Sequence, residues 1–110
     1  MASKFNLKKA SNEQFHFNLL AGNGEIILSS EQYKAKQSAL DGIESVRKNA
    51  QRAGAFEVKA AAGGKYHFVL KASNGQVIGQ SQLYASEAGA VAGTESVQKN
   101  APDATLQDDA

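Results

Sequence analysis

The chain has 110 residues, of which 42% are apolar and 21% charged, and its formal net charge is +1. These values describe one domain of ordinary composition or two very small ones, and a chain of this size can bury one shared core. The absence of cysteine excludes thiol catalysis, disulfides and thiolate metal sites. No run of about 18 apolar residues occurs and the first residues lack the apolar stretch of an export signal, so we expect a cytoplasmic protein without a membrane span.

A tandem repeat is the strongest signal in the sequence. Residues 4–50 align with residues 55–101 without a gap, 51 positions apart, and 20 of the 47 aligned pairs are identical. Chance would give roughly three identities, so the chain contains an internal duplication. We expect residues 1–110 to form a single domain, with repeat 1 at about 4–50, repeat 2 at about 55–101 and an acidic tail at 102–110. That tail is typical of a solvated segment.

Each repeat begins with two segments in which apolar and polar residues alternate, which is the pattern of half-buried strands. These segments cover residues 5–8, 15–21, 56–59 and 66–72. In the second segment of each repeat, the aromatic residues share one parity with Leu19 or Leu70, so they are predicted to face the core. His16 and His67 have the opposite parity and are predicted to lie on the outer face of the sheet.

Asn-Gly at residues 23–24, repeated 51 positions later, predicts a hairpin turn, since glycine adopts the positive φ that such turns require. A two-residue loop would pair Leu19 with Leu28, whereas a three-residue loop would pair Leu19 with Ile27. The second repeat offers the same choice. We predict the three-residue loop, because it places Ile27 and its counterpart Ile78 on the aromatic face.

A helix is predicted over about residues 36–48 and again 51 positions later, because small and apolar residues recur there at helical spacing. Gly42 and Gly93 interrupt these helices at a cost of roughly 1 kcal/mol each relative to alanine, which predicts close contact with a bulky residue of the sheet. Three residues are predicted to form helix ends: Ser86 as an N-cap, and Asn49 and Asn100 as left-handed terminators.

The predicted repeat is therefore a β-β-β-α unit. The apolar stripe of its helix is too narrow for one unit to close a core alone, but two units can share one. The predicted fold class is α+β, with one antiparallel sheet built from both repeats. Two helices would cover its aromatic face around a pseudo-twofold axis.

Both repeats carry the motifs F-x-[LV]-K, [FY]-H-F-x-L-x-A-x-N-G, [IV]-I, S-x-x-Y and E-S-V-x-K-N-A. In these motifs, which span residues 4–101, the chain resembles the YegP-like family of small uncharacterised bacterial proteins. The resemblance implies a β-β-β-α unit completed by a further strand, with pairs of units exchanging terminal strands to form one sheet. The segment around Thr105, Leu106 and Gln107 is the candidate for that strand. The resemblance does not indicate a particular biochemical activity, because none is established for the family.

Catalytic and cofactor-binding motifs are absent: the sequence has no phosphate-binding loop, dinucleotide fingerprint, nucleophile elbow or H-E-x-x-H helix. Ser30 or Ser81 with His16 or His67 is the best nucleophile and base, but no acid that would orient the histidines can be named. We therefore expect no enzyme, no catalytic residue and no cofactor. Two histidines in separate repeats are too few for a metal site, so we expect no bound metal.

Candidate binding residues are shared by both repeats and carry polar groups. They are His16, His67, Tyr33, Tyr84, Ser30 and Ser81. Each type also has a structural interpretation. The histidines can be cross-strand neighbours at the surface, and the tyrosines can pack their rings at the core edge with a local hydrogen bond.

Nucleic-acid binding is the first alternative function. Single-strand binders stack bases on outward aromatic rings in a basic groove. Here the rings are predicted to face the core, and Lys8, Lys59 and Lys71 give only a mild basic patch. We expect instead a non-enzymatic binding or interaction module, a monomer that recognises a protein or peptide through an exposed strand edge or the outer sheet face. An unrecognised small-molecule site or enzyme is the other alternative.

Overall fold

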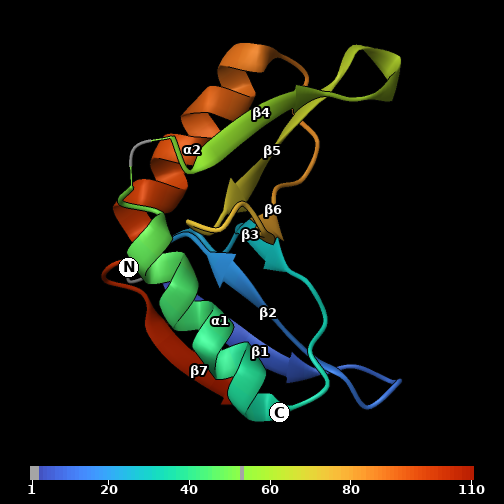
Figure 1. The fold of residues 1–110 in the computed structure, drawn as a ribbon. Helices are drawn as coiled ribbons and strands as arrows, with labels where there is room; N and C mark the ends of the chain where they lie inside the picture. Colours follow the sequence, from blue (N-terminus) through green and yellow to red (C-terminus); the bar gives the residue numbers. More distant parts are fainter. Residues whose placement is uncertain (1–2, 53) are drawn as a thin grey trace.

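The computed structural model describes residues 3–52 and 54–110, which form one seven-stranded sheet with two helices on one face (Figure 1). The strands are β1 (Lys4–Lys9), β2 (Phe15–Leu20), β3 (Ile26–Ser30), β4 (Phe56–Ala60), β5 (Tyr66–Lys71), β6 (Val77–Gln80) and β7 (Thr105–Asp109). The helices are α1 (Lys36–Asn49) and α2 (Glu87–Asn100), and a short 3-10 turn covers Ala62–Gly64. The predicted α+β class is confirmed, but the sheet is not antiparallel throughout, because β7 pairs parallel with β1.

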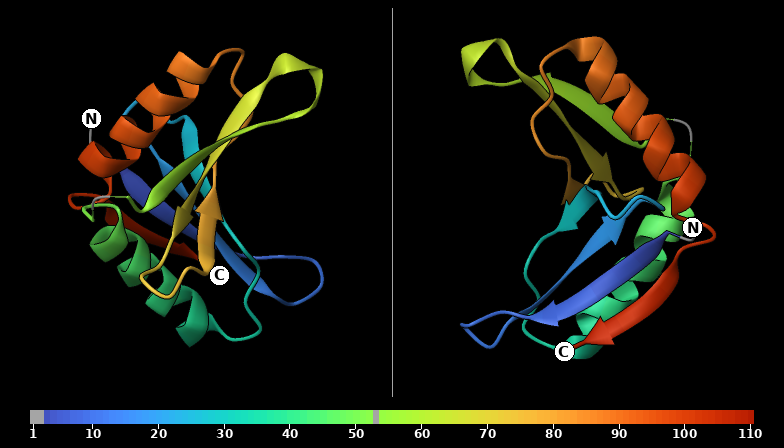
Figure 2. Two further views of the ribbon diagram at one scale, coloured as in Figure 1. Left: turned by 45° about the horizontal axis from the view of Figure 1, so that its top comes forward. Right: turned by 180° about the vertical axis from the view of Figure 1, so that it is seen from behind.

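The two repeats join edge to edge in the middle of the sheet. The strand order is β4-β5-β6-β3-β2-β1-β7, and β3 pairs antiparallel with β6. In this pair Ser29 lies opposite Gln80, and these residues occupy the same position in the two repeats. A pseudo-twofold axis therefore passes through the centre of the sheet. Both helices lie on the same face of the sheet (Figure 2).

The hairpin between β2 and β3 has the predicted three-residue tip. The Ala21 N–H donates to the Glu25 carbonyl at 2.9 Å, which leaves residues 22–24 as the loop. Gly24 has a φ of +87°, a conformation that favours glycine over any residue with a Cβ. The second repeat has the same bonds at the equivalent positions.

The predicted strand register is nevertheless wrong beyond the tip. Leu20 pairs with Ile26, but a bulge then shifts the ladder so that Leu19 lies opposite Leu28, and not opposite Ile27. The bulge places two residues of β3 against one of β2, and it allows both Ile27 and Leu28 to be buried. The second repeat carries the same shift. The prediction assumed that buried and exposed residues alternate strictly along β3, whereas two consecutive apolar residues are buried there.

One core lies between the sheet and the helices and contains residues of both repeats. Its largest fully buried side chains include Phe5, Leu7, Phe17, Phe68 and Val46. Helix α1 contacts β5 and β6 of the second repeat as well as β2, and α2 contacts β3 as well as β4 and β5. The aromatic rings of β2 and β5 thus face the helices, as predicted. Neither helix of the described chain is long and apolar enough to cross a membrane.

The helix glycines mark the close contacts that the sequence predicted. A Cβ built on Gly42 would lie 2.6 Å from Tyr33 Oη and 3.0 Å from Phe17 Cε2. On Gly93 it would lie 2.5 Å from Tyr84 Oη. Each helix therefore rests directly on a tyrosine, and the absence of a side chain is what allows this approach.

The helix ends confirm one cap prediction and correct two. Ser86 Oγ accepts a hydrogen bond from the Gly89 N–H at 3.1 Å, as an N-cap does. Asn49 and Asn100, however, are not left-handed: each is the last residue of its helix, and among the described residues only Glu13 and some glycines have a positive φ. The Asn49 Nδ2 instead donates to the Ser45 carbonyl at 2.9 Å, and Asn100 makes the equivalent bond. An intrahelical bond thus holds each asparagine within the last turn.

The C-terminal segment forms β7, which pairs parallel with β1 and places Leu106 opposite Phe5. All five residues of β7 are exposed, yet its carboxylates are not simply solvated. Asp108 Oδ2 lies 2.6 Å from Lys36 Nζ on α1, and Asp109 Oδ2 accepts a 2.7 Å hydrogen bond from the Asn6 side chain. The composition of this segment predicted a solvated tail, which is wrong, whereas the resemblance implied a further strand around Thr105, Leu106 and Gln107, which is confirmed.

Candidate functional site

The two candidate serines each bridge a break in the sheet. Ser30 Oγ accepts from the Phe17 N–H at 2.9 Å and donates to the Glu31 carbonyl at 2.7 Å. Ser81 makes the same two bonds in the second repeat, at 2.9 and 2.8 Å. The hydroxyl thereby replaces a backbone carbonyl where the ladder is irregular. Among the described residues, no hydrogen bond joins either serine to a histidine.

The two candidate tyrosines pack between sheet and helix. The Tyr33 ring stacks on Phe17 with ring centroids 6.3 Å apart, and Tyr84 stacks on Phe68 at 6.2 Å. Burial raises the pKa of the Tyr33 hydroxyl, and the nearby Glu31 carboxylate raises this pKa further. Both rings fill the space left by the helix glycines, so packing at the core edge accounts for their presence in both repeats.

The two candidate histidines lie on the outer face of the sheet, as predicted. His16 lies opposite Lys8, and His67 lies opposite Lys59. Each ring is half-buried, and its Nδ1 atom is buried without a hydrogen-bond partner among the described residues. The histidines belong to separate repeats, and in the described part of the chain no three acidic or histidine side chains gather as metal ligands would.

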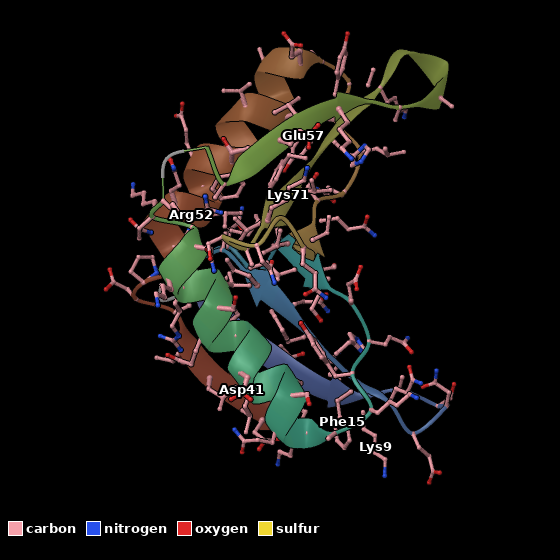
Figure 3. All side chains as sticks on the ribbon, in the orientation of Figure 1. Lys9, Phe15, Asp41, Arg52, Glu57 and Lys71 are labelled. Carbon is pink, nitrogen blue, oxygen red and sulfur yellow. The ribbon has the colours of Figure 1, made fainter. Side chains whose placement is uncertain are left out.

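A polar cleft of about 490 Å³ opens between α1 and the turn that joins β5 to β6. It is lined by Asp41, Glu44, Ser45, Lys48, Asn49, Arg52, Ala72, Ser73 and Asn74. Arg52 crosses it, donating through Nε to Asn49 Oδ1 at 3.2 Å and through Nη2 to the Lys71 carbonyl at 2.9 Å (Figure 3). The shared motifs E-S-V-x-K-N-A and A-x-N-G meet here, which is the signal that could have located the cleft. These bonds fasten α1 to the other repeat.

The free edge of β4 differs from its counterpart in the first repeat. β4 pairs with β5 on one side and has no strand on its other side among the described residues. β1, its counterpart, lies between β2 and β7. Phe5 and Leu7 of β1 are fully buried, whereas the equivalent Phe56 and Val58 of β4 are only half-buried. Val91, which lies on the adjacent helix α2, is 43% exposed.

The order of the elements explains why this edge is open. The chain that leaves α2 forms β7 and covers β1 (Figure 1). By symmetry, the chain that leaves α1 would cover β4, but it becomes β4 itself. Joining the repeats in one chain therefore leaves the sheet one strand short, and the missing strand is at β4.

Backbone groups for a further strand are present on this edge. The Lys71 N–H donates to the Ala55 carbonyl at 2.8 Å. Because hydrogen-bonded and outward-facing residues alternate along an edge strand, the N–H and C=O groups of Phe56 and Val58 point away from β5. An unpaired edge of this kind is a template for an added strand.

Carboxylates border the edge. Glu57 on β4 forms an ion pair with Lys71 on β5 at 2.5 Å, and the hydrogen bond from Lys71 holds the pKa of Glu57 below its ordinary value (Figure 3). Glu87 begins α2, at the position that Lys36 occupies in α1. The sequence favoured binding at an exposed strand edge or at the outer sheet face, but it does not indicate which edge is free.

Comparisons with known proteins give a consistent family. A family model described as a domain of unknown function (DUF1508) matches twice, at residues 10–57 and 61–108. A UPF0339 protein of Pseudomonas aeruginosa is 71% identical over 109 residues, which cover 99% of both chains. UPF0339 protein YegP of Escherichia coli K12 is 48% identical and covers 98% of both chains.

Two solved structures share the fold. The solution NMR structure of E. coli yegP, a protein of unknown function, superimposes with a TM-score of 0.92 at 48% identity, covering 99% of this chain and 94% of that one. The solution structure of a UPF0339 protein from Shewanella oneidensis gives a TM-score of 0.91 at 44% identity, covering 98% and 92%. None of these names assigns an activity. The chain belongs to the DUF1508 (UPF0339) family of bacterial proteins and carries the family unit twice.

Proposed function

We propose that this protein is a non-enzymatic binding module that captures an extended segment of another polypeptide along the free edge of β4. The added segment would become the eighth strand of the sheet, a mode of recognition known as β-augmentation. Main-chain hydrogen bonds to Phe56 and Val58 would supply affinity, and the half-buried side chains of these residues, with the exposed Val91 of α2, would select side chains.

The single observation that carries the proposal is the unequal covering of equivalent strands. Phe5 and Leu7 of β1, which pairs with β7, are completely buried, while Phe56 and Val58 remain half-buried beside an exposed Val91. The family model supports the same comparison, because each of its two matches ends in the strand that follows a helix. β4 and β7 are thus equivalent in the family unit, and only β1 receives such a strand as an additional neighbour.

The other edge of the sheet is a weaker candidate. β7 also has a free side, but its five residues are all exposed and include Asp108 and Asp109. Charged residues on an exposed edge strand are a common protection against unwanted strand pairing. β4 instead presents half-buried apolar side chains next to its free backbone groups.

A pair of proline variants tests the proposal. Proline removes a backbone N–H, and at Val58 or at Leu106 that N–H faces the free edge and not the neighbouring strand. We propose to select binders for the wild-type protein from a display library of random peptides. Wild-type binding that is lost in Val58→Pro and kept in Leu106→Pro would support capture at β4.

Folding of both variants is checked by circular dichroism. If Val58→Pro does not fold, Val58→Lys serves instead, because a lysine on the edge also opposes strand addition. The proposal fails if no peptide is enriched, or if the enriched peptides bind the β4 variants as tightly as they bind the wild type.

A further inference from the structure

We infer that the β4 edge accepts an extended segment running parallel to β4, with an apolar residue opposite Phe56 and a lysine or arginine opposite Val58. This inference rests on the proposed function and specifies its ligand. It comes from the one strand that already occupies an equivalent position, β7 on β1, and from the charges that differ between the two positions.

The contacts of β7 define what a docked strand meets. β7 runs parallel to β1, with Leu106 opposite Phe5 and Asp108 opposite Leu7. Side chains alternate between the two faces of the sheet, so Leu106 and Asp108 lie on the helix side. There Asp108 reaches Lys36 in the first turn of α1.

On the outer face, Asp109 and Gln107 lie beside β1. The Asn6 Nδ2 donates to Asp109 Oδ2 at 2.7 Å and also lies 3.4 Å from the Gln107 carbonyl. The acidic strand is therefore held by a cation on the helix side and by an amide donor on the outer side. Each anchor donates to a carboxylate of β7: Lys36 to Asp108, and Asn6 to Asp109.

At the free edge both anchors are replaced by carboxylates. Lys36 corresponds to Glu87, and Asn6 corresponds to Glu57. The registers that place these residues are the same in the two repeats, since Phe5 pairs with Leu19 as Phe56 pairs with Leu70. Glu57 is already paired with Lys71, so the charge on the helix side decides: Glu87 repels an acidic residue opposite Val58 and favours a basic one.

The same charge disfavours a second copy of this chain as the donor of β7. Its Asp108 would face the carboxylate of Glu87, and like charges in contact oppose binding. Glu87 also has a role within its own helix, because a carboxylate in the first turn complements the helix dipole. This helix-dipole role of Glu87 does not require a ligand. The test therefore reverses the charge in the peptide and also in the protein.

The probes are two nonapeptides. PDATLQDDA is the sequence of residues 102–110 of this chain, and PDATLQKKA is the same peptide with both aspartates of β7 changed to lysine. Each is titrated into the ¹⁵N-labelled full-length protein, and the amide shifts of β4 and of Val91 are followed by NMR. We expect PDATLQKKA to bind at least about tenfold more tightly than PDATLQDDA.

Charge reversal in the protein completes the test. Glu87→Lys is expected to abolish or invert the preference. Glu95→Lys is the control, because it makes the same charge change on α2. Glu95 is equivalent to Glu44, and Glu44 faces the turn of the other repeat. Glu95→Lys should therefore leave the peptide preference unchanged.

The outcomes separate the two proposals. Equal binding of both peptides, tighter binding of the acidic one, or a preference that survives Glu87→Lys overturns the charge inference and leaves edge capture standing. Absence of β4 shifts with PDATLQKKA at millimolar concentration also overturns this inference, whatever the proline variants show. Capture of random peptides that does not depend on Val58 overturns the proposed function itself.

Discussion

Leu28 packs against Gly79, the residue that occupies its own position in the other repeat. A Cβ built on Gly79 would lie 3.0 Å from both Cγ and Cδ2 of Leu28. The two residues lie next to the pseudo-twofold axis, where β3 meets β6. The leucine of repeat 1 and the glycine of repeat 2 therefore share a space that two leucines would overfill. At this contact each repeat is shaped to pack against the other repeat and not against a second copy of itself.

Gly79→Ala is expected to destabilise the protein by about 1 to 2 kcal/mol, because Leu28 is 1% exposed and has little room to move. Urea denaturation would measure the free energy of unfolding. In the Leu28→Ala background the same glycine change should cost about 1 kcal/mol less, since the space is then free. Equal costs in both backgrounds would show that the two side-chain positions are not coupled.

Alanine in place of the helix glycines should destabilise despite its better helix propensity. The propensity gain is about 1 kcal/mol, but overpacking against a buried ring costs about 1 to 3 kcal/mol. Gly93→Ala should cost more than Gly42→Ala, because the added Cβ would lie 2.8 Å from Phe68 Cε2, against 3.0 Å from the corresponding Phe17 atom. Thermal unfolding followed by circular dichroism would rank the two variants.

Gly89 offers the matched control for this ranking. It also lies in α2, but a Cβ there would meet no atom closer than 3.3 Å. Gly89→Ala should therefore leave stability unchanged or raise it by up to about 1 kcal/mol. A loss at Gly89 as large as that at Gly93 would mean that helix glycine is needed for a reason other than the tyrosine contact.

Ser30→Ala and Ser81→Ala are each expected to lower the free energy of unfolding by about 1 to 2 kcal/mol, because the N–H of Phe17 or Phe68 loses its acceptor in a part-buried site. The two losses should be similar, since the bonds are equivalent. Hydrogen exchange of the two phenylalanine amides would rise in the corresponding variant only. A variant with unchanged stability would show that water replaces the hydroxyl.

Much of this fold could be predicted because the duplication repeats every local signal. Alternation located the strands, and Gly42 and Gly93 indicated where the helices approach the sheet. The register could not be predicted, since Ile27 and Leu28 are both apolar and alternation alone does not say which one faces Leu19. The conformation of Asn49 and Asn100 at the helix ends was predicted wrongly, because an asparagine amide can bond within the helix as readily as it tolerates a left-handed turn.

The candidate site was harder to predict, because it depends on what the repeats do not share. Residues common to both repeats, such as Ser30 and Tyr33, have packing or bridging roles in both. The free edge of β4 follows from counting strands after the topology is known. Its charge follows from Glu87, which replaces Lys36 and looks like an ordinary surface residue in the sequence.

The contact between Lys36 and Asp108 gives a prediction for pH. The hydrogen bond from Lys36 is the main reason that the pKa of Asp108 lies below its ordinary value of 3.8, and the bond from the Ala110 N–H contributes next. A lowered pKa in the folded state stabilises the protein at pH values above the pKa of the unfolded chain. This stabilisation is lost as the pH falls through the folded value, below about pH 4.

Lys36→Gln should therefore raise the pKa of Asp108 towards its ordinary value and leave it somewhat lowered, because the Ala110 N–H still donates to Oδ1 at 3.1 Å. Carboxyl carbon shifts followed by NMR from pH 2 to 6 would measure this. The pKa of Glu57 serves as the internal control, since it depends first on Lys71 and should not move. An unchanged pKa of Asp108 would mean that Lys36 does not hold β7, and the charge comparison between β7 and the β4 edge would lose its basis.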